Sequence, residues 1–225
     1  WALALTTEAG DEANTSPLYW LCRNPDGQAL LREQLDPAIL NGIPREAWAL
    51  TRTASAGAYA NTSPLYWLCA SPEGRALLRD HPAILNGIPP EAWALARTTA
   101  AGSDANTSPL YWLCCTPEGR ALLRDHPTIL NGIPPEAWAL ARTTGAGAGA
   151  NATPLYWLCR NPEGQDLLRN RPDILNDIPP EAWALARTSE AGADANTSPL
   201  YLLCGTPEGR ALLRDHPAIL NGIPP

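Results

Sequence analysis

One nine-residue segment, Asn-Thr-Ser-Pro-Leu-Tyr-Trp-Leu-Cys, recurs along the whole 225-residue chain. It begins at Asn14, Asn61 and Asn106, and it returns with substitutions at Asn151 and Asn196. The first two starts are 47 residues apart and each later pair is 45 residues apart. A nearly fixed period of this length is typical of tandem units that bury their apolar faces against one another. The period therefore favours an elongated stack of units over an ordinary globule.

The repeat divides the chain into a single tandem-repeat segment, 1–225. We assign a partial unit at 1–13, units at 14–60, 61–105, 106–150 and 151–195, and a partial unit at 196–225. Neither end carries the polar, atypical repeat that caps a free-standing solenoid. We therefore expect the chain to be a piece of a longer protein.

Each unit carries three sequence signals for the start of a helix. In unit 61–105, Ser63 before Pro64 and Ser71 before Pro72 are N-cap residues followed by proline at the first helical position. The third start is at Pro90, and its Ala- and Leu-rich helix is predicted to end near Gly102. We expect three short helices per unit, with Pro82 ending or kinking the second.

The second helix of the unit is predicted to be amphipathic. Leu77 and Leu78 should face inward, whereas Arg75 and Arg79, four residues apart, should share a solvent face. Gly87, followed by an isoleucine and a proline, is predicted to end a helix in the left-handed conformation. Asp177 takes this position in unit 151–195, and aspartate tolerates that conformation better than most residues.

These signals predict an all-α fold, a right-handed α-solenoid of about five tandem helical repeats with three short helices per repeat. No strand-like alternation is visible, and about 45 residues is the length of HEAT and armadillo units.

A local resemblance to ankyrin repeats adds one expectation about function. The run Ser198-Pro199-Leu200-Tyr201 resembles the Thr-Pro-Leu-His start of an ankyrin helix, and 191–196 resembles the Gly-Ala-Asp-Val-Asn stretch that ends an ankyrin unit. The match covers about a third of each repeat, whose 45-residue period differs from the roughly 33 residues of ankyrin. The resemblance implies protein binding and transfers no contact residues.

Composition excludes several classes of partner. The formal charge of −7, with no Lys- or Arg-rich run, counts against a nucleic-acid or anionic-membrane surface. No apolar stretch reaches the roughly 18 residues of a membrane-spanning helix. We expect no nucleic acid, no membrane insertion, no cofactor and no small-molecule substrate.

Cysteine recurs at one position of the unit, as Cys22, Cys69, Cys114, Cys159 and Cys204, and Cys115 is additional. Equivalent positions in stacked units should lie about 10 Å apart, beyond the roughly 7 Å between Cα atoms that a disulfide spans. We predict buried, reduced thiols, with only Cys115 a candidate for exposure. Unpaired cysteines lean toward a reducing, cytoplasmic compartment, although the location stays unknown.

Histidine occurs at one loop position, as His81, His126 and His216, where other units carry Asp36 and Arg171. A metal or catalytic role would not survive such replacement, so we predict no catalytic residue, no metal site and no enzyme. The Asn-X-Ser/Thr triplets match a glycosylation acceptor. Turn and cap chemistry is the favoured explanation and needs no sugar, because proline always follows and the hydroxyl is the expected helix cap.

Tryptophan forms two rows. One consists of Trp20, Trp67, Trp112 and Trp157, with Leu202 in the fifth position, and the other consists of Trp1, Trp48, Trp93, Trp138 and Trp183. Exposed rows would suit sugars or Pro-rich peptides. Packing between units is the favoured interpretation. Leu202 keeps the bulk of the tryptophan that it replaces and lacks its aromatic ring, so this position requires size and not ring chemistry.

Variation between units indicates where a partner would bind. It concentrates after the third helix and at the residue after each cysteine, which gives as candidate partner-facing residues Arg23, Ala70, Cys115, Arg160, Gly205, Tyr59, Asp104 and Asp194. The alternative is that these positions vary between units because they face solvent and are only weakly constrained. The sequence thus predicts a non-enzymatic repeat scaffold, a protein-binding or spacer segment of a larger protein. A self-assembling, filament-forming subunit that stacks through its repeat ends is the second hypothesis.

Overall fold

The computed structural model describes residue 2, residues 15–51, 61–96, 106–140, 151–185 and 197–221, and residue 223. All regular secondary structure in these ranges is helical, which confirms the all-α class. The α-helices are short because every one except α4 (Arg45–Ala49) begins at a proline. Proline has no backbone N–H and cannot continue a preceding helix, so each new proline also limits the helix before it.

Two helices open each unit, and a single residue separates them. The first helices are α1 (Pro17–Arg23), α5 (Pro64–Ala70), α8 (Pro109–Cys115), α11 (Pro154–Arg160) and α15 (Pro199–Gly205). The second helices are α2 (Pro25–Glu33), α6 (Pro72–Asp80), α9 (Pro117–Asp125), α12 (Pro162–Arg169) and α16 (Pro207–Asp215). In unit 61–105 the separating residue is Ser71, whose Oγ accepts a hydrogen bond from the Gly74 amide at 3.0 Å. The predicted second N-cap is therefore confirmed.

Two shorter helical segments complete the unit. The third segments are α3 (Pro37–Asn41), η1 (Pro82–Leu85), η2 (Pro127–Leu130), α13 (Pro172–Asp177) and η3 (Pro217–Leu220), of which the η segments are 3₁₀ turns. The fourth are α4, α7 (Pro90–Ala94), α10 (Pro135–Ala139) and α14 (Pro180–Ala184). Three helices per repeat was therefore an incomplete prediction, because Pro82 and its equivalents start a new turn as well as ending a helix.

The fourth segment is also shorter than predicted. α7 ends at Ala94, because Leu95 has the extended angles φ −65° and ψ 113°. The helix therefore stops well before the expected end near Gly102, a residue that itself lies outside the described ranges.

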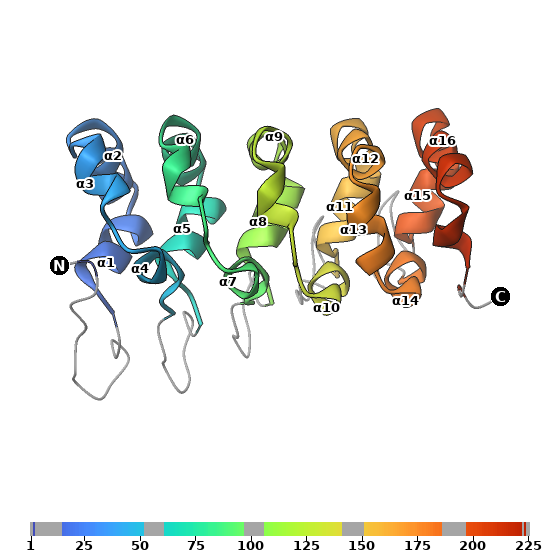
Figure 1. Ribbon diagram of the computed structural model, residues 1–225, viewed down its shortest axis with the longest axis horizontal. Helices are drawn as coiled ribbons and strands as arrows, with labels where there is room; N and C mark the ends of the chain where they lie inside the picture. The colour runs from blue at the N-terminus through green and yellow to red at the C-terminus, as the bar shows by residue number, and fades with distance from the viewer. Residues whose placement is uncertain are drawn as a thin grey trace.

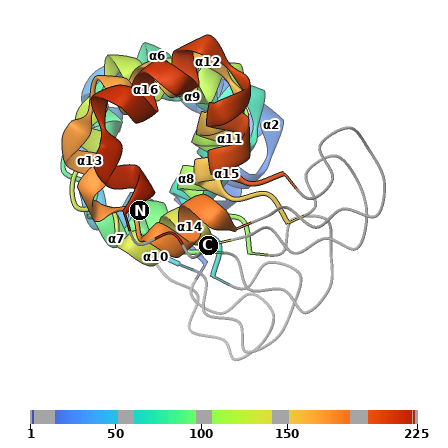
Figure 2. The ribbon, with the colours of Figure 1, turned by 90° about the vertical axis from the view of Figure 1, so that its right-hand side faces the viewer.

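Equivalent helices of successive units contact one another along the molecule. α1 contacts α5, α5 contacts α8, α8 contacts α11 and α11 contacts α15, and the second helices follow the same order. Figure 1 shows the successive sets standing side by side from the N- to the C-terminal end. Viewed along that direction, the helices surround a common centre (Figure 2).

The predicted helix stop at Gly87 is correct for some units only. Gly87 and Gly132 have positive φ, at 72° and 69°. Gly42 has φ −82°, and Asp177 is the last residue of the longer helix α13. The left-handed prediction for Asp177 is thus wrong, because a further helical residue replaces the left-handed stop.

The core consists of leucine, isoleucine, tryptophan and tyrosine side chains from every set of helices. Trp48, Trp93, Trp138 and Trp183 are each 1% exposed, which confirms the packing interpretation for the described members of that row. One continuous hydrophobic cluster extends from Ala2 to Ile219. Each unit therefore shares its interior with its neighbours.

Candidate functional site

The first helix of each unit is held at its N-terminus by its own repeat motif. The Oγ of Ser108 accepts a hydrogen bond from the Tyr111 amide at 3.1 Å, and Pro109 occupies the first helical position. Asn106, two residues earlier, has a left-handed φ of 59°, a conformation that asparagine tolerates. The turn and cap chemistry predicted for the Asn-X-Ser/Thr triplet is confirmed here.

A hydroxyl pair joins the first helix of one unit to the segment that leads into the first helix of the next. Tyr19 Oη lies 2.8 Å from Thr62 Oγ1, and Tyr66 Oη lies 2.8 Å from Thr107 Oγ1. All four residues are buried. The same hydrogen bond thus recurs one unit further on, where water cannot replace it.

A polar side chain at one position of each second helix, buried in all but the last, ties that helix to the first helix of the same unit. Arg75 Nη1 donates to the Cys69 carbonyl at 2.8 Å, and Arg120 Nη1 donates to the Cys114 carbonyl at 3.1 Å. Arg75 is only 5% exposed, so the prediction that it shares a solvent face with Arg79 is wrong. The last carbonyls of a helix have no intrahelical donor, and the guanidinium supplies one.

The same side chains also reach the next unit, and they do so in two ways. Where the residue is arginine, it approaches an acid: Arg75 Nη2 lies 3.7 Å from Glu118 Oε2, and Arg120 Nη2 lies 3.7 Å from Glu163 Oε2. These acids lie in the first turn of the following second helix, where the helix dipole favours negative charge.

Where the residue is glutamine, it accepts from a hydroxyl of the next unit. Gln28 Oε1 accepts from Ser71 Oγ at 2.6 Å, and Gln165 Oε1 accepts from Thr206 Oγ1 at 3.0 Å. We call these two arrangements the Arg–acid joint and the Gln–hydroxyl joint. The sequence interpretation missed both joints, although the exchange between Gln and Arg at one repeat position was the available signal.

The first tryptophan row lies half-buried beside these joints. Trp67 and Trp112 pack edge-to-face on Tyr66 and Tyr111, with ring centroids 5.3 and 5.6 Å apart. Leu202 packs against the core in the equivalent position. The row therefore contributes to packing and also leaves part of its indole surface open.

Five of the predicted partner-facing residues end successive first helices. Arg23, Ala70 and Cys115 are half-buried, and Arg160 and Gly205 are exposed. They form one row, because the helices that carry them contact in order. The other three, Tyr59, Asp104 and Asp194, lie outside the described residues.

Two members of this row cover tryptophan rings. The Arg23 guanidinium carbon lies 4.9 Å from the Trp20 ring centroid and 6.0 Å from that of Trp67 in the next unit. Arg160 lies 5.4 Å from the Trp157 ring centroid. Cation–π contacts of this kind fix a positive charge over an aromatic surface.

The cysteines follow the expected pattern with one exception. Cys22, Cys69, Cys114 and Cys159 are buried, and burial raises the pKa of each thiol above its ordinary value. Cys204 is exposed and Cys115 is half-buried, so the prediction that only Cys115 could be exposed is wrong. A raised pKa disfavours the thiolate, which is the reactive form.

The histidines of the three units that carry one share a single repeat position. His81, His126 and His216 follow the ends of α6, α9 and α16 and are half-buried. Among the described residues, no group of three or more His, Cys, Asp or Glu side chains could hold a metal ion.

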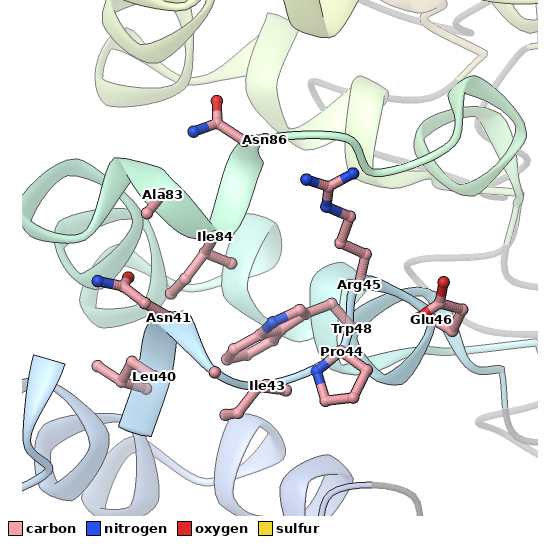
Figure 3. Close-up of a pocket in the computed structure, with 11 residues that line it drawn as sticks. Leu40, Asn41, Ile43, Pro44, Arg45, Glu46, Trp48, Ala83, Ile84 and Asn86 are labelled. Atoms are coloured by element: carbon pink, nitrogen blue, oxygen red, sulfur yellow. The ribbon is translucent and has the colours of Figure 1, made fainter. Parts of the chain in front are cut away.

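A cavity of about 510 Å³ lies where the third and fourth segments of the first set meet the next set (Figure 3). Trp48 and Ile43 line it together with Asn41 and Asn86, which are equivalent residues of successive units. Arg45 extends toward the segment that carries Asn86 (Figure 3). A related cavity of about 350 Å³ lies between the last two sets, lined by Asn176, Asn221 and Trp183.

Comparisons with protein-family models, with curated proteins and with solved structures found no match for this chain. In the part of the chain that the structure describes, no helix is long and apolar enough to span a membrane.

Proposed function

We propose that the chain is a right-handed α-solenoid segment of about five tandem repeats that acts as a non-enzymatic scaffold, binding a protein or spacing other parts of a larger protein. One observation carries this proposal. The hydroxyl pair Tyr19–Thr62 recurs as Tyr66–Thr107, so neighbouring units meet through the same buried contact. Units joined by one repeated contact extend the molecule in one direction.

The distribution of polar groups supports a scaffold over an enzyme. The buried polar side chains Arg75, Arg120 and Gln165 form hydrogen bonds to helix ends and to neighbouring units. The buried cysteines have raised pKa values, which suits packing and opposes nucleophilic chemistry.

Small-angle X-ray scattering of the chain, compared with a variant that carries one additional copy of residues 106–150, tests this proposal. We expect a rod whose longest dimension grows by about 10 Å, the spacing of packed helices. An unchanged longest dimension would contradict the solenoid.

The row Arg23, Ala70, Cys115, Arg160 and Gly205 is the surface that we propose for a protein partner. Its cation–π pairs present charge and aromatic surface together, as many protein interfaces do. Affinity purification should recover a partner with the wild-type chain and lose it when Arg23 and Arg160 are replaced by Glu. Equal recovery with both chains would favour the spacer role.

A second candidate is end-to-end self-assembly of this segment through the two faces that a single 225-residue copy leaves uncovered. On the leading face, Leu30 and Ile39 are 41% and 47% exposed, whereas their equivalents Leu77 and Ile84 are 0% and 3% exposed. On the trailing face, Tyr201 and Leu220 are 65% and 49% exposed, whereas Tyr66 and Leu85 are 1% and 6% exposed.

The two faces are the two sides of one internal joint. Leading-face positions are buried wherever a unit precedes them, and trailing-face positions are buried wherever a unit follows. Contacts between two different faces do not close on themselves and produce open filaments. Light scattering that grows with protein concentration would support this candidate, and a concentration-independent monomer would remove it.

A further inference from the structure

We propose that a cavity between α9 and α12 binds a carboxylate group on a short apolar stem, either a free carboxylate ligand or the glutamate side chain of a protein partner. The cavity has a volume of about 280 Å³ and lies at the joint between units 106–150 and 151–195. The two helices contact each other side by side (Figure 1). Because it lies on second helices, this site is separate from the row that ends the first helices.

The joint between the first two sets of helices shows what a carboxylate does at this place. Arg32, in the last turn of α2, donates to Asp80 Oδ2 at 2.6 Å, and Asp80 is the last residue of α6 in the next unit. The same carboxyl group lies 3.5 Å from Arg79 of its own helix. One carboxylate therefore joins two arginines that belong to neighbouring units.

Unit 151–195 differs from the other units at this position. Helices α6, α9 and α16 each end in aspartate, whereas α12 ends at Arg169 and is followed by Asn170. The next residue is Arg171, where those three units have histidine. The end of this second helix therefore has one carboxylate fewer and one guanidinium more than the other three, which favours a carboxylate supplied by a ligand.

Arg124 is the guanidinium that we expect to meet the ligand. It has the repeat position of Arg32, and the residue across the joint that corresponds to Asp80 is the neutral Asn170. Its acid is Asp125, the next residue in the chain, at 3.2 Å, and both side chains are more than half exposed. An exposed pair of this kind is weak, so the guanidinium can turn toward a carboxylate in the cavity.

The two acids that line the cavity are each matched by another arginine. Glu163 Oε2 lies 3.7 Å from Arg120 Nη2, and Asp166 Oδ1 lies 3.1 Å from Arg169 Nη1. Acids paired in this way repel an incoming anion less strongly. Arg120 itself lines the cavity, is only 6% exposed, and its buried Nε has no hydrogen-bond partner among the described residues.

Apolar side chains and a second arginine shape the rest of the cavity. Leu123 and Leu167 line it, which suits a short aliphatic stem. Arg171 crosses the joint and donates to the Pro127 carbonyl, while its ion pair with Asp173 at 2.5 Å holds it in place. Arg171 therefore connects the two units at the edge of the cavity, beside the position of the expected carboxylate.

Titration of the 225-residue chain with butyrate, followed by NMR, tests the proposal. We expect the backbone amide signals of Leu123 and Leu167 and the Nε–H signal of Arg124 to shift and to saturate at millimolar concentrations, the affinity range of a small fragment. Butyramide has the same shape and no charge, and it should leave these signals in place.

Two variants should each weaken butyrate binding about tenfold or more, because each removes the charge match at Arg124. Asn170→Asp introduces the residue that ends α6, α9 and α16, so it preserves the fold and competes with the ligand. Arg124→Gln removes the guanidinium. Arg79→Gln is the matched control, since Arg79 has the same repeat position at another joint and should leave the affinity unchanged.

A second titration distinguishes the two sources of the carboxylate. Its probes are the peptide acetyl-Ala-Glu-Ala-amide and the matched peptide that carries glutamine. Saturable shifts with butyrate and with the glutamate peptide support a side chain of a protein partner, and shifts with butyrate alone support a free ligand.

Three results would overturn the proposal. The first is the absence of saturable shifts with either carboxylate. The second is an equal response to the neutral amides. The third is butyrate binding that Asn170→Asp and Arg124→Gln leave intact, or that Arg79→Gln weakens as much as Arg124→Gln does, because either pattern means that the anion binds to exposed arginines in general.

Discussion

Tyr66 Oη lies 2.8 Å from Thr107 Oγ1, and the two buried hydroxyls belong to neighbouring units 41 residues apart in the chain. The tyrosine belongs to the first helix of one unit, and the threonine lies just before the first helix of the next unit. Tyr19 and Thr62 repeat the arrangement one unit earlier. At the next joint, Ala152 replaces the threonine and is 0% exposed, so packing without this hydroxyl is also accommodated.

Tyr66→Phe should lower the free energy of unfolding by about 1 kcal/mol, the usual net value of one buried hydrogen bond. Urea unfolding of Tyr66→Phe, Thr107→Val and the double variant would measure the coupling of the two hydroxyls. Tyr201→Phe, at an exposed equivalent position, should change stability very little. Independent effects of the two substitutions would show that the pair does not act as a joint.

Gly119→Ala should be strongly destabilising, whereas Gly205→Ala should be tolerated. A Cβ on Gly119 would lie 2.5 Å from the Leu113 Cα, which is backbone and cannot move aside cheaply. At Gly205 no atom lies within 4 Å of such a Cβ, and unit 61–105 already has Ala70 in that position. Thermal unfolding of the two variants checks this contrast, and similar melting temperatures would contradict the close approach of α8 and α9.

Ser108→Ala should cost on the order of 1 kcal/mol, because the Tyr111 amide would lose its side-chain cap. Ser108→Thr is the matched control, since Thr153 already caps the Tyr156 amide at 3.0 Å. Circular dichroism during urea unfolding measures both variants. Unchanged stability in Ser108→Ala would contradict the capping role.

Thiol labelling of the native chain should modify Cys204 first and Cys115 more slowly, and should spare the other four cysteines. Burial raises the pKa of the Cys69 thiol, although the nearby Arg75 lowers it by a smaller amount. The buried thiols should react only after unfolding in denaturant. Rapid labelling of all six cysteines in the native chain would contradict the burial of four of them in the core.

Stability should fall slightly as pH drops below about 4, in part through Asp80. A hydrogen bond from Arg32 at 2.6 Å holds the pKa of the Asp80 carboxyl below its ordinary value. Because the folded-state pKa is the lower one, the carboxylate stabilises the fold above the unfolded-state pKa. That contribution is lost as pH falls through the folded-state pKa.

The pair is partly exposed, so its contribution is at most about 1 kcal/mol. Unfolding of the wild type and of Asp80→Asn at about pH 6 and about pH 3, on either side of the ordinary aspartate pKa, would measure it. A stability difference that persists unchanged at the lower pH would contradict this assignment.

The sequence alone determined the helices, because their signals are local. Ser63 and Pro64 cap and start a helix whatever surrounds them, and the 45-residue period shows that the same signals return. Burial of Trp93 and Cys69 also followed from repeat position and side-chain chemistry. The segment after Pro82 was missed because proline both ends and begins helical turns.

Only the tertiary structure decided the role of Arg75. On its own helix it has the spacing of a solvent-facing residue, and nothing local indicates that the Cys69 carbonyl and Glu118 lie on either side of it. The same holds for Tyr66, whose hydroxyl partner lies 41 residues away. Local patterns fix backbone conformation, whereas partners in neighbouring units are defined only when the units stack, since stacking brings those groups together and removes water from between them.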